Sequence, residues 1–377
     1  MSGGWPVMVV GGGPAGAAFA LAAARAGQAV LVLERRTQPH DKVCGEFISG
    51  EAAAALARLG LDLAALGAQP IERLGLNLGP RRIERPLPFP ALSLSRRRLD
   101  AALLDAARAQ GASVVQAHVL GLEREGPGEG GGWRARLDDG GAPSARHAVL
   151  AVGKHDLKGH RRGRGLQDDL VGFKMHWRLA PRQALALAGA VELFLFEGGY
   201  AGLEPVEDGV ANLCLLVRRS RLSALGGGWP ALLAALTAEA PRLGERLAGA
   251  APLWPKPLAV SAIPYGYVQA RAQGLWRLGD QAAVIPSFAG DGLAIALHSA
   301  GQAATAWLAG EAPERFQRRL AHDLGLRVRA AALVSQVLTQ PVGQRLSMAA
   351  AALWPGLAPG VAAATRVPQR ALARDWA

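Results

Sequence analysis

Residues 7–16 read VMVVGGGPAG, an apolar run that leads directly into a cluster of glycines. Gly11, Gly13 and Gly16 satisfy the pattern G-x-G-x-x-G. In this pattern the first glycine permits a tight turn, the second lets backbone N–H groups approach a pyrophosphate, and the third lets a helix pack closely on a strand. The stretch therefore predicts a strand, a phosphate-binding turn and the start of a helix.

The residues that follow supply the structural context that this pattern requires. Residues 15–27, AGAAFALAAARAG, predict an Ala-rich helix that ends at Gly27, and residues 28–34, QAVLVLE, predict a second strand. Glu34 ends that strand, where an acidic side chain hydrogen-bonds a ribose hydroxyl and disfavours a 2′-phosphate. The sequence thus predicts a βαβ unit that binds a dinucleotide.

Composition and charge narrow the classes of function. The chain has 377 residues, of which 50% are hydrophobic, enough for one large or two interlocked domains. The net charge is +12, but the basic residues are scattered and their densest cluster, GHRRGRG at 159–165, lacks interleaved aromatics. We therefore expect no nucleic-acid binding. The two cysteines, Cys44 and Cys214, favour a reducing, cytoplasmic location.

The rest of the chain divides by its hydrophobic patterns. Residues 170–220 alternate apolar and polar positions, as antiparallel strands do. We expect helices at 51–67, 95–111 and 229–250, a strand at 258–270, and mostly helix from 290 to about 354. The predicted fold is α/β, with a doubly wound Rossmann-like cofactor domain, an inserted antiparallel-sheet substrate domain and C-terminal helices. The expected boundaries are 1–75, 92–168 and 272–310 for the cofactor domain, 76–91 and 169–271 for the substrate domain, and 311–377 for the C-terminal helical region.

The N-terminal stretch also resembles a known family. Residues 9–35 are very similar to the fingerprint of FAD-dependent monooxygenases and reductases of the para-hydroxybenzoate hydroxylase and geranylgeranyl reductase type. Residues 95–112, SRRRLDAALLDAARAQGA, look like that family's Arg-x-x-Leu-Asp helix, and residues 275–304 look like its second FAD signature. The resemblance implies a cofactor site formed by Gly11, Gly13, Ala15, Gly16, Glu34, Arg35, Arg96, Val119, Gly279, Asp280, Gly290 and Gly292.

The second signature implies FAD rather than NAD as the bound cofactor. A nicotinamide dehydrogenase has no reason to bring a segment near residue 280 back to the same ribose and phosphates. By the resemblance, Asp280 accepts a hydrogen bond from a ribityl hydroxyl, and PSFAGDG at 286–292 offers backbone amides to the flavin pyrimidine. NADPH or NADH is the expected electron donor.

Two further stretches resemble the geranylgeranyl reductase branch, and other features depart from the hydroxylases. KVCGEFIS at 42–49 looks like that branch's cysteine-glycine segment beside the flavin ring, and GGYAGLEPVEDGVANLCLLV at 198–217 looks like its substrate-sheet segment. The Asp-Gly motif of aromatic hydroxylases is replaced by LAVGKHDLKG, and the Trp and Lys signature of flavin halogenases is missing. The sequence therefore speaks against halogenation.

We expect few side chains with acid-base duties, because a flavin carries the difficult chemistry. Glu46 is the candidate proton donor or substrate anchor, with a surface carboxylate as its alternative. Cys44 is a candidate reactive thiol, with a small buried residue as its alternative. His155, His160 and His176 lack metal-ligand spacing, so we expect no metal site.

The leading functional hypothesis is an NAD(P)H-driven, FAD-dependent monooxygenase that acts on a hydrophobic or aromatic small molecule in secondary metabolism. A first alternative is an FAD-dependent reductase or dehydrogenase of isoprenoid or polyketide double bonds. A second alternative is a non-catalytic flavoprotein that binds a membrane or a partner. In that hypothesis the Ala/Leu-rich C-terminal helices associate weakly with a lipid surface, with Arg327, Arg329 and Arg345 at the headgroups.

Overall fold

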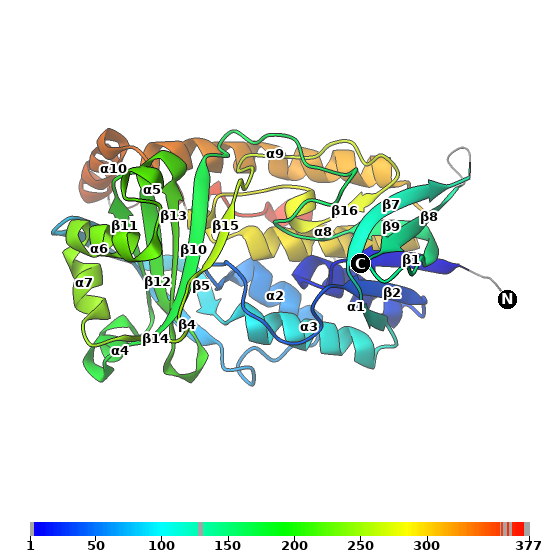
Figure 1. Cartoon of the computed structure of the whole chain (residues 1–377), viewed down its shortest axis with the longest axis horizontal. Coiled ribbons are helices and arrows are strands. Elements are labelled where there is room, and N and C mark those ends of the chain that lie inside the picture. The colour runs from blue at the N-terminus through cyan, green and yellow to red at the C-terminus, as the bar shows by residue number, and fades with distance from the viewer. Residues whose placement is uncertain (1–3, 127–130, 355, 357–359, 362–363, 373–377) are drawn as a thin grey trace.

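Two sheets stand at opposite ends of an elongated molecule, with helices between and along them (Figure 1). The computed structural model describes residues 4–126, 131–354, 356, 360–361 and 364–372. Part of the expected C-terminal helical region, 311–377, therefore lies outside the described residues. None of the helices in the described ranges combines the length and the apolar character that crossing a membrane requires.

The first sheet contains the glycine-rich turn and has seven strands in the order β6-β2-β1-β9-β8-β7, with β16 paired to β9. Its strands are β1 (Trp5–Val10), β2 (Val30–Glu34), β6 (Ser113–Gln116), β7 (Val119–Glu125), β8 (Gly132–Leu137), β9 (Ser144–Leu150) and β16 (Trp276–Arg277). Strands β1 and β2 pair in parallel, with Val7 opposite Val30, and helix α1 (Pro14–Arg25) connects them. This arrangement is the predicted βαβ unit.

Helix α1 packs against both α3 (Arg96–Ala109) and α8 (Gly292–Leu308) beside this sheet. Ser95 caps α3 as its sequence predicts, because its Oγ accepts a hydrogen bond from Arg98 N at 3.2 Å. The small side chains of α1 allow close helix packing, and ten of its residues are buried. The core of this half is therefore built around the helix that follows the glycine turn.

The second sheet has nine strands in the order β14-β10-β13-β12-β11-β4-β5-β3, with β15 paired to β10. Its strands are β3 (Phe47–Ser49), β4 (Gln69–Leu78), β5 (Arg81–Ser93), β10 (Leu170–Arg178), β11 (Ala190–Phe196), β12 (Gly199–Pro205), β13 (Ala211–Arg218), β14 (Ala251–Pro252) and β15 (Leu258–Ser261). The alternating segment 170–220 thus forms four neighbouring strands, β10, β13, β12 and β11. All three pairings between these neighbours are antiparallel.

The remaining helices cover the second sheet or run along the molecule. Helices α6 and α7 pack on one face of the second sheet, and α9 runs along the upper edge in Figure 1 with α10 at its end. The bounds are α2 (Gly50–Arg58), α4 (Pro181–Leu187), α5 (Arg219–Ala224), α6 (Trp229–Glu239), α7 (Pro241–Leu247), α9 (Pro313–Leu338), α10 (Pro341–Leu353) and α12 (Gln369–Leu372), with 3-10 turns η1 (Glu207–Gly209), η2 (Gly279–Gln281) and η3 (Ser287–Ala289).

Several expected boundaries are wrong, each for a local reason. The helix expected at 51–67 ends at Arg58, because Gly60 takes a φ of 78° and its N–H bonds back to Ala57. The helix expected at 229–250 is interrupted, because Pro241 begins a new helix. The strand expected at 258–270 ends at Ser261.

The division between the two sheets also falls earlier than expected. Strand β4 begins at Gln69 and pairs with β11 and β5, so residues 69–75 lie in the second sheet. Residues 47–49 form β3 of the same sheet. We therefore propose that the substrate domain takes in β3, β4 and β5 whole.

Candidate functional site

The glycine turn at the carboxyl end of β1 has no room for side chains at two positions. Gly11 has a φ of 103°, and a Cβ there would lie 2.5 Å from the carbonyl oxygen of Ala151. A Cβ on Gly16 would overlap the carbonyl oxygen of Gly11. These two glycines therefore let the turn and α1 approach the sheet, as the fingerprint predicts.

Gly13 differs, because its open side faces two cations. A Cβ on Gly13 would meet nothing closer than Arg96 Nη2 at 3.9 Å and Lys42 Nζ at 4.0 Å. Gly13 is also the N-cap of α1, and no side chain caps the free N–H groups of the first turn. Uncapped amides, a helix dipole and two cations together fit a pyrophosphate.

Asp100 holds these two cations in place. Its carboxylate lies 2.7 Å from Arg96 Nε and 2.8 Å from Lys42 Nζ. Burial alone would raise the pKa of Asp100, but Arg96 and then Lys42 lower it. Burial likewise opposes the charge of Arg96, whereas Asp100 and then Cys44 raise its pKa. The cluster therefore stays ionised and preserves a net positive charge beside Gly13.

Glu34 closes the other side of the glycine turn. Its Oε2 accepts a hydrogen bond from Gly12 N at 2.6 Å, and its Oε1 accepts one from Arg36 N at 3.0 Å. Arg35 is exposed next to it, and Val119 at the start of β7 is buried in the core cluster that contains Val10. The structure thus gathers these residues at the carboxyl end of β2, and their contacts to the cofactor remain a proposal.

The segment near residue 280 returns to the start of α1. A Cβ on Gly279 would lie 3.3 Å from Ala15 Cβ, and Gly279 N donates to Ser299 Oγ of α8 at 2.9 Å. Asp280 follows in η2, half-buried. Gly290 takes a φ of 68° and lies against the Phe47 ring. The two distant signatures therefore meet in space.

Strand registers give the second sheet one apolar and one mixed face. Leu213 pairs with Met175 on one side and Leu203 on the other, and this row packs on α6 and α7. The opposite face carries two polar rows, because residues directly opposite one another share a face. The rows are His176, Asn212 and Glu204, and Lys174, Cys214 and Gly202.

The loop that carries Cys44 and Glu46 docks onto these polar rows. Asn212 Nδ2 donates to the carbonyl oxygens of Cys44 and Gly45 at 3.1 and 2.9 Å. Glu46 takes a φ of 63°, a conformation that few non-glycine residues adopt. The sheet therefore fixes this loop between itself and the N-terminus of α3.

Glu46 is a buried carboxylate with three partners. Its Oε1 contacts Lys174 Nζ and accepts from Arg96 N at 2.8 Å, and its Oε2 lies 2.7 Å from His176 Nε2. Burial alone would raise its pKa, but Lys174 and then His176 bring it below the ordinary value. The lowered pKa favours the carboxylate form of Glu46, so of the two expected roles, proton donor and substrate anchor, we propose that Glu46 acts as an anchor.

Glu204 has the opposite character. Its side chain is buried, and neither carboxyl oxygen has a hydrogen-bond partner among the described residues. Burial first, and then the charges of Glu46 and Cys44, raise its pKa well above the ordinary value. Glu204 is therefore a buried carboxyl group with a raised pKa, on the same sheet face as the Glu46 cluster.

The next row on this face meets the second FAD signature. Tyr200 packs edge-on against Phe288 of η3 with ring centroids 6.1 Å apart, and Tyr265 Oη lies 3.0 Å from Ser287 Oγ. Tyr200 also shares an apolar cluster with Leu216. The mixed face of the sheet is thus bordered by segment 286–289 on one side and by the Cys44–Glu46 loop on the other.

The remaining candidate residues have ordinary surroundings. Cys44 is half-buried, and its Sγ accepts from Glu46 N at 3.4 Å. His160 packs edge-on against Trp133, and burial first, with nearby cations, lowers the pKa of His155. Oxygen and nitrogen donors of Asp41, Glu46 and His176 lie within 4.8 Å of one another, but Lys174 already supplies their positive partner.

Lys174, His176 and Glu204 are the functional candidates that sequence reasoning missed. The sequence contains a signal for Lys174 and His176. They are two residues apart in the mostly apolar strand VGFKMHWRL, so both side chains lie on one face of that strand. A charged residue on a buried strand requires a partner. The partner, Glu46, lies in a distant loop and cannot be read from the strand.

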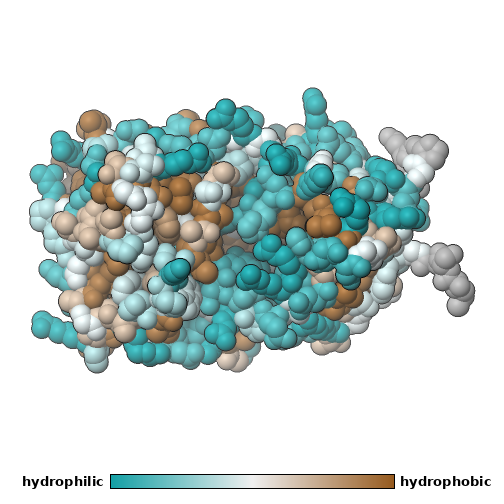
Figure 2. Space-filling view, in the orientation of Figure 1, coloured by the Kyte–Doolittle hydropathy of each residue, from teal (hydrophilic) through white to brown (hydrophobic). Residues whose placement is uncertain are grey.

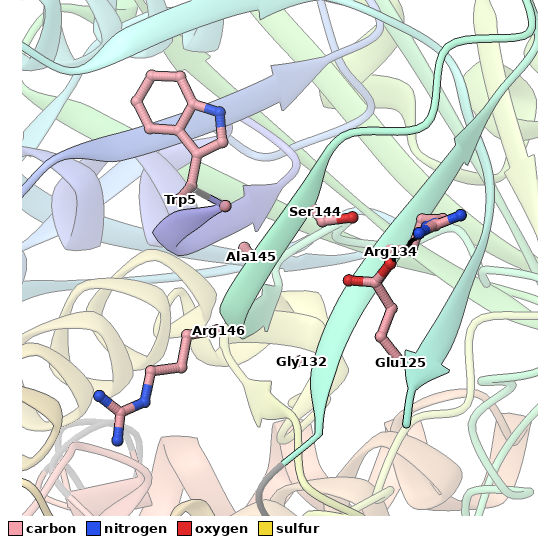
Figure 3. A pocket seen from close by; sticks show the side chains of 8 residues that line it. Trp5, Glu125, Gly132, Arg134, Ser144, Ala145 and Arg146 are labelled. Carbon is pink, nitrogen blue, oxygen red and sulfur yellow. Dashed lines mark hydrogen bonds and ion pairs between the residues drawn. The ribbon is translucent and has the colours of Figure 1, made fainter. Parts of the chain in front are cut away.

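An open pocket lies elsewhere on the molecule. It has a volume of about 620 Å³ and is lined by Trp5, Arg134 and Arg146, with the other residues that Figure 3 labels. Trp5 begins β1, whereas the glycine turn follows its last residue, Val10. This pocket therefore lies at the amino end of β1, whereas the candidate cofactor site lies at the carboxyl end of that strand.

Comparison with known proteins agrees with this geometry. Residues 5–163 match a family described as FAD binding domain. A menaquinone reductase of Mycolicibacterium smegmatis is 31% identical over 222 residues, 55% of this chain and 53% of the relative. A menaquinone reductase of Mycobacterium tuberculosis is 54% identical over 55 residues, 15% of this chain and 14% of the relative. The chain spans about half the length of the first of these relatives.

Solved structures share the fold over most of the chain. A myxobacterial FAD-dependent chondrochloren halogenase aligns with a TM-score of 0.74 at 23% identity, over 98% of this chain and 94% of its own. A flavin-dependent brominase aligns with a TM-score of 0.77 at 17% identity, over 98% and 96%. At these identities the likeness shows the fold alone. Residues 5–163 thus match an FAD binding domain, and the chain as a whole shares the fold of FAD-dependent halogenases.

Proposed function

We propose that this chain is an FAD-dependent reductase of a hydrophobic substrate with conjugated or isoprenoid double bonds, such as a menaquinone-like lipid. The observation that carries the proposal is Glu204, a buried carboxyl group without a hydrogen-bond partner among the described residues, on the sheet face between the two flavin-side segments. Burial and then the charge of Glu46 raise its pKa. Reduction of a double bond requires a proton as well as a hydride, and a carboxyl with a raised pKa supplies that proton near neutral pH. The relative named menaquinone reductase supports the same substrate class.

The residues of the chain divide the work between binding and proton delivery. FAD, when bound and reduced, would supply a hydride. Gly13, Arg96 and Lys42 would bind its pyrophosphate, and Asp100 orients the two cations. Glu204 gives its proton to the substrate carbon next to the one that receives the hydride. It ends the step as a carboxylate and regains a proton from solvent before the next turnover.

The Glu46 cluster makes Glu204 an acid. Lys174 and His176 keep Glu46 ionised, and the negative charge of Glu46 raises the pKa of Glu204 further than burial alone. Glu46 is therefore a positioning residue, since its carboxylate contacts the loop, α3 and the sheet. Two carboxyls with opposite pKa shifts on one face are an arrangement typical of acid-base sites.

The test is anaerobic turnover with a menaquinone that has an unsaturated side chain. FAD-loaded protein is reduced with NADPH, NADH or dithionite and mixed with the lipid without oxygen. The extracted lipid is then re-oxidised in air, which returns any quinol to the quinone, and the mass of the product is measured by mass spectrometry. We expect a product heavier by two hydrogens. In the Glu204→Gln variant we expect product formation to fall by roughly a hundredfold, with reduction of the flavin by its donor unchanged. Lack of any anaerobic product would refute the proposal.

Monooxygenation is the second candidate, because the shared fold with flavin-dependent halogenases extends over nearly the whole chain. The same experiment distinguishes the two reactions. A monooxygenase forms a product heavier by one oxygen atom, only in air, whereas a reductase gives the same reduced product with or without oxygen.

A further inference from the structure

We propose that the exposed face of helices α9 and α10 docks onto the surface of an anionic lipid bilayer. Leu326 of α9 is 79% exposed and Leu346 of α10 is 65% exposed. The other large apolar side chains exposed on these helices and just after them are Leu333, Val337, Val342, Leu353 and Trp354. Figure 2 shows apolar atoms projecting at the upper left of the molecule, where Figure 1 places α10.

These side chains form a stripe on each helix. Leu326, Leu333 and Val337 are spaced by seven and four residues, and Val342, Leu346 and Leu353 by four and seven, so each set lies on one helix face. The other face of α9 is buried in the core, where Leu324 and Val328 are about 1% exposed. Both helices thus present apolar side chains to the core and to the outside. A helix that faces only water carries polar residues on its outer face.

The charges on these helices have one sign. The exposed charged residues in the described part of α9 and α10 are Arg315, Arg318, Arg329 and Arg345. Their acidic residues are turned inward, because Asp323 is buried and half-buried Glu314 accepts a hydrogen bond from Gly274 N at 2.8 Å. Arg318, Arg329 and Arg345 form no ion pair within the described ranges, so their charges are free to meet anionic headgroups.

A groove continues this face beside α10. It has a volume of about 570 Å³, and its lining joins apolar Leu195, Phe196 and Pro341 to two arginines, Arg81 and Arg345, and two glutamates, Glu197 and Glu239. Both glutamates are paired with Arg221, so the groove adds apolar surface, and the attraction to anionic phosphates comes from the arginines of the exposed helix face. Each arginine near an anionic lipid surface contributes about 1 kcal/mol of attraction.

A second copy of the chain is a poorer occupant of this face. Symmetric dimers pair the same patch on both subunits, so this pairing would place exposed arginines against arginines. The net charge of +12 adds to the repulsion. An apolar stripe flanked by basic residues is instead typical of helices that lie in a membrane interface. The inference rests on this surface alone and goes beyond the proposed reduction.

The test is flotation of the full-length, FAD-loaded protein with vesicles of phosphatidylcholine, with or without phosphatidylglycerol. We expect the protein to float with the anionic vesicles and to be released by high salt. The double variants Leu326→Asp/Leu346→Asp and Arg329→Glu/Arg345→Glu should each lower the ratio of bound to free protein by more than about tenfold. Leu185→Asp is the matched control, because Leu185 is also 79% exposed but lies on α4.

Two outcomes would overturn the inference. One is the absence of wild-type protein from the anionic vesicle fraction, and the other is equal flotation of the double variants and the Leu185→Asp control. Light scattering adds a check in solution. If the wild type is a dimer and Leu326→Asp/Leu346→Asp a monomer, the face is a protein interface and the lipid assignment is wrong. Unfolding midpoints and flavin content of every variant show whether it has folded.

Discussion

Glu46 joins three parts of the molecule through one carboxylate, which contacts Lys174 and His176 of β10 and Arg96 N of α3. Glu46→Gln leaves the Lys174 ammonium buried, with only Asp41 at 4.0 Å as a carboxylate partner. We expect the free energy of unfolding to fall by about 3–5 kcal/mol, measured by urea titration. Glu123→Gln is the control, since Glu123 is exposed and lies 3.7 Å from Arg136, and it should change little.

The pH dependence of this effect has a defined sign. Because the folded pKa of Glu46 is below its ordinary value of 4.5, its contribution to stability is complete above that value and is lost as the pH falls through the folded pKa. The difference in stability between wild type and Glu46→Gln should therefore shrink in acid. A difference independent of pH would mean that Glu46 acts through packing rather than charge.

The contribution of Glu204 to stability should depend on pH in the opposite direction. Its folded pKa is raised, so its contribution to stability is complete below the ordinary value of 4.5 and is lost as the pH rises through the folded pKa. Glu204→Gln keeps the shape and removes the ionisation. We expect the variant to gain stability relative to wild type as the pH rises, in urea titrations at several pH values. Parallel curves for the two proteins would show that Glu204 is ionised already and would remove it as a proton donor.

At the residue scale, sequence predicted the glycines better than the acids. Gly11, Gly13 and Gly16 have roles that follow from spacing alone, because backbone geometry dictates them. The role of Glu46 depends on Lys174 of β10, and a contact across so long a chain segment is not encoded in local pattern. Sequence identified Glu46 as a candidate, but the direction of its pKa shift required the neighbours that only the fold supplies.

Among the elements, the N-terminus of α1 offers the sharpest test of cofactor binding. Gly13 has a φ of −70°, and a Cβ on it meets only ordinary contacts, so Gly13→Ala should fold normally. The added methyl group would stand between the free amides and the pyrophosphate. We expect FAD affinity to fall by at least about tenfold, measured by flavin fluorescence, with an unchanged unfolding midpoint.

Gly228→Ala is the matched control for this variant. Gly228 is the N-cap of α6, has a φ of −101°, and also has room for a Cβ. It belongs to the second sheet's helices, so we expect wild-type FAD affinity. Equal affinities for Gly13→Ala and wild type would place the pyrophosphate elsewhere.

The C-terminal segment is a second element with a titratable contact. Arg366 Nη1 lies 3.0 Å from Asp291 Oδ1 at the start of α8, and its guanidinium lies 3.8 Å from the Phe89 ring centroid. Burial raises the pKa of Asp291 to about 6, with Arg366 opposing the rise. The contribution of Asp291 to stability is thus lost as the pH rises through about 6. In urea titrations we expect the free energy of unfolding of Asp291→Asn to rise relative to that of wild type over this pH range. Parallel curves would contradict a raised pKa of Asp291 in the folded protein.

The bounds of the helices and strands show how far local sequence patterns predict the structure. The predicted strand, helix and strand over residues 7–34 are confirmed, because period and capping agree there. The helix that begins at Gly50 is shorter than its Ala/Leu content indicates, since the left-handed Gly60 ends it within two residues of Arg58. The place of β4 and β5 in the second sheet could not be predicted from local pattern, because it is set by the pairing of β4 with β11.

At the scale of the whole molecule, the sequence predicted that two distant signatures converge, and the contact between Gly279 and Ala15 shows this convergence. The sequence did not predict the face of the second sheet that carries Lys174, His176 and Glu204. That face depends on the register of β10, β13 and β12, in which a slip of one residue would turn Lys174, His176 and Glu204 away from the loop. The sequence pattern predicts which residues of a strand share a face. It does not predict which of the two faces of the sheet packs against the cofactor-binding half.

The central claim is that the glycine turn and the segment around residue 280 hold one FAD between them. Titration of the purified full-length chain with FAD, followed by flavin fluorescence and absorbance, tests it directly. The account predicts saturable binding of one FAD per chain and a bound flavin spectrum altered by the protein. A well-folded protein that stays colourless and leaves the fluorescence of added FAD unchanged would contradict it.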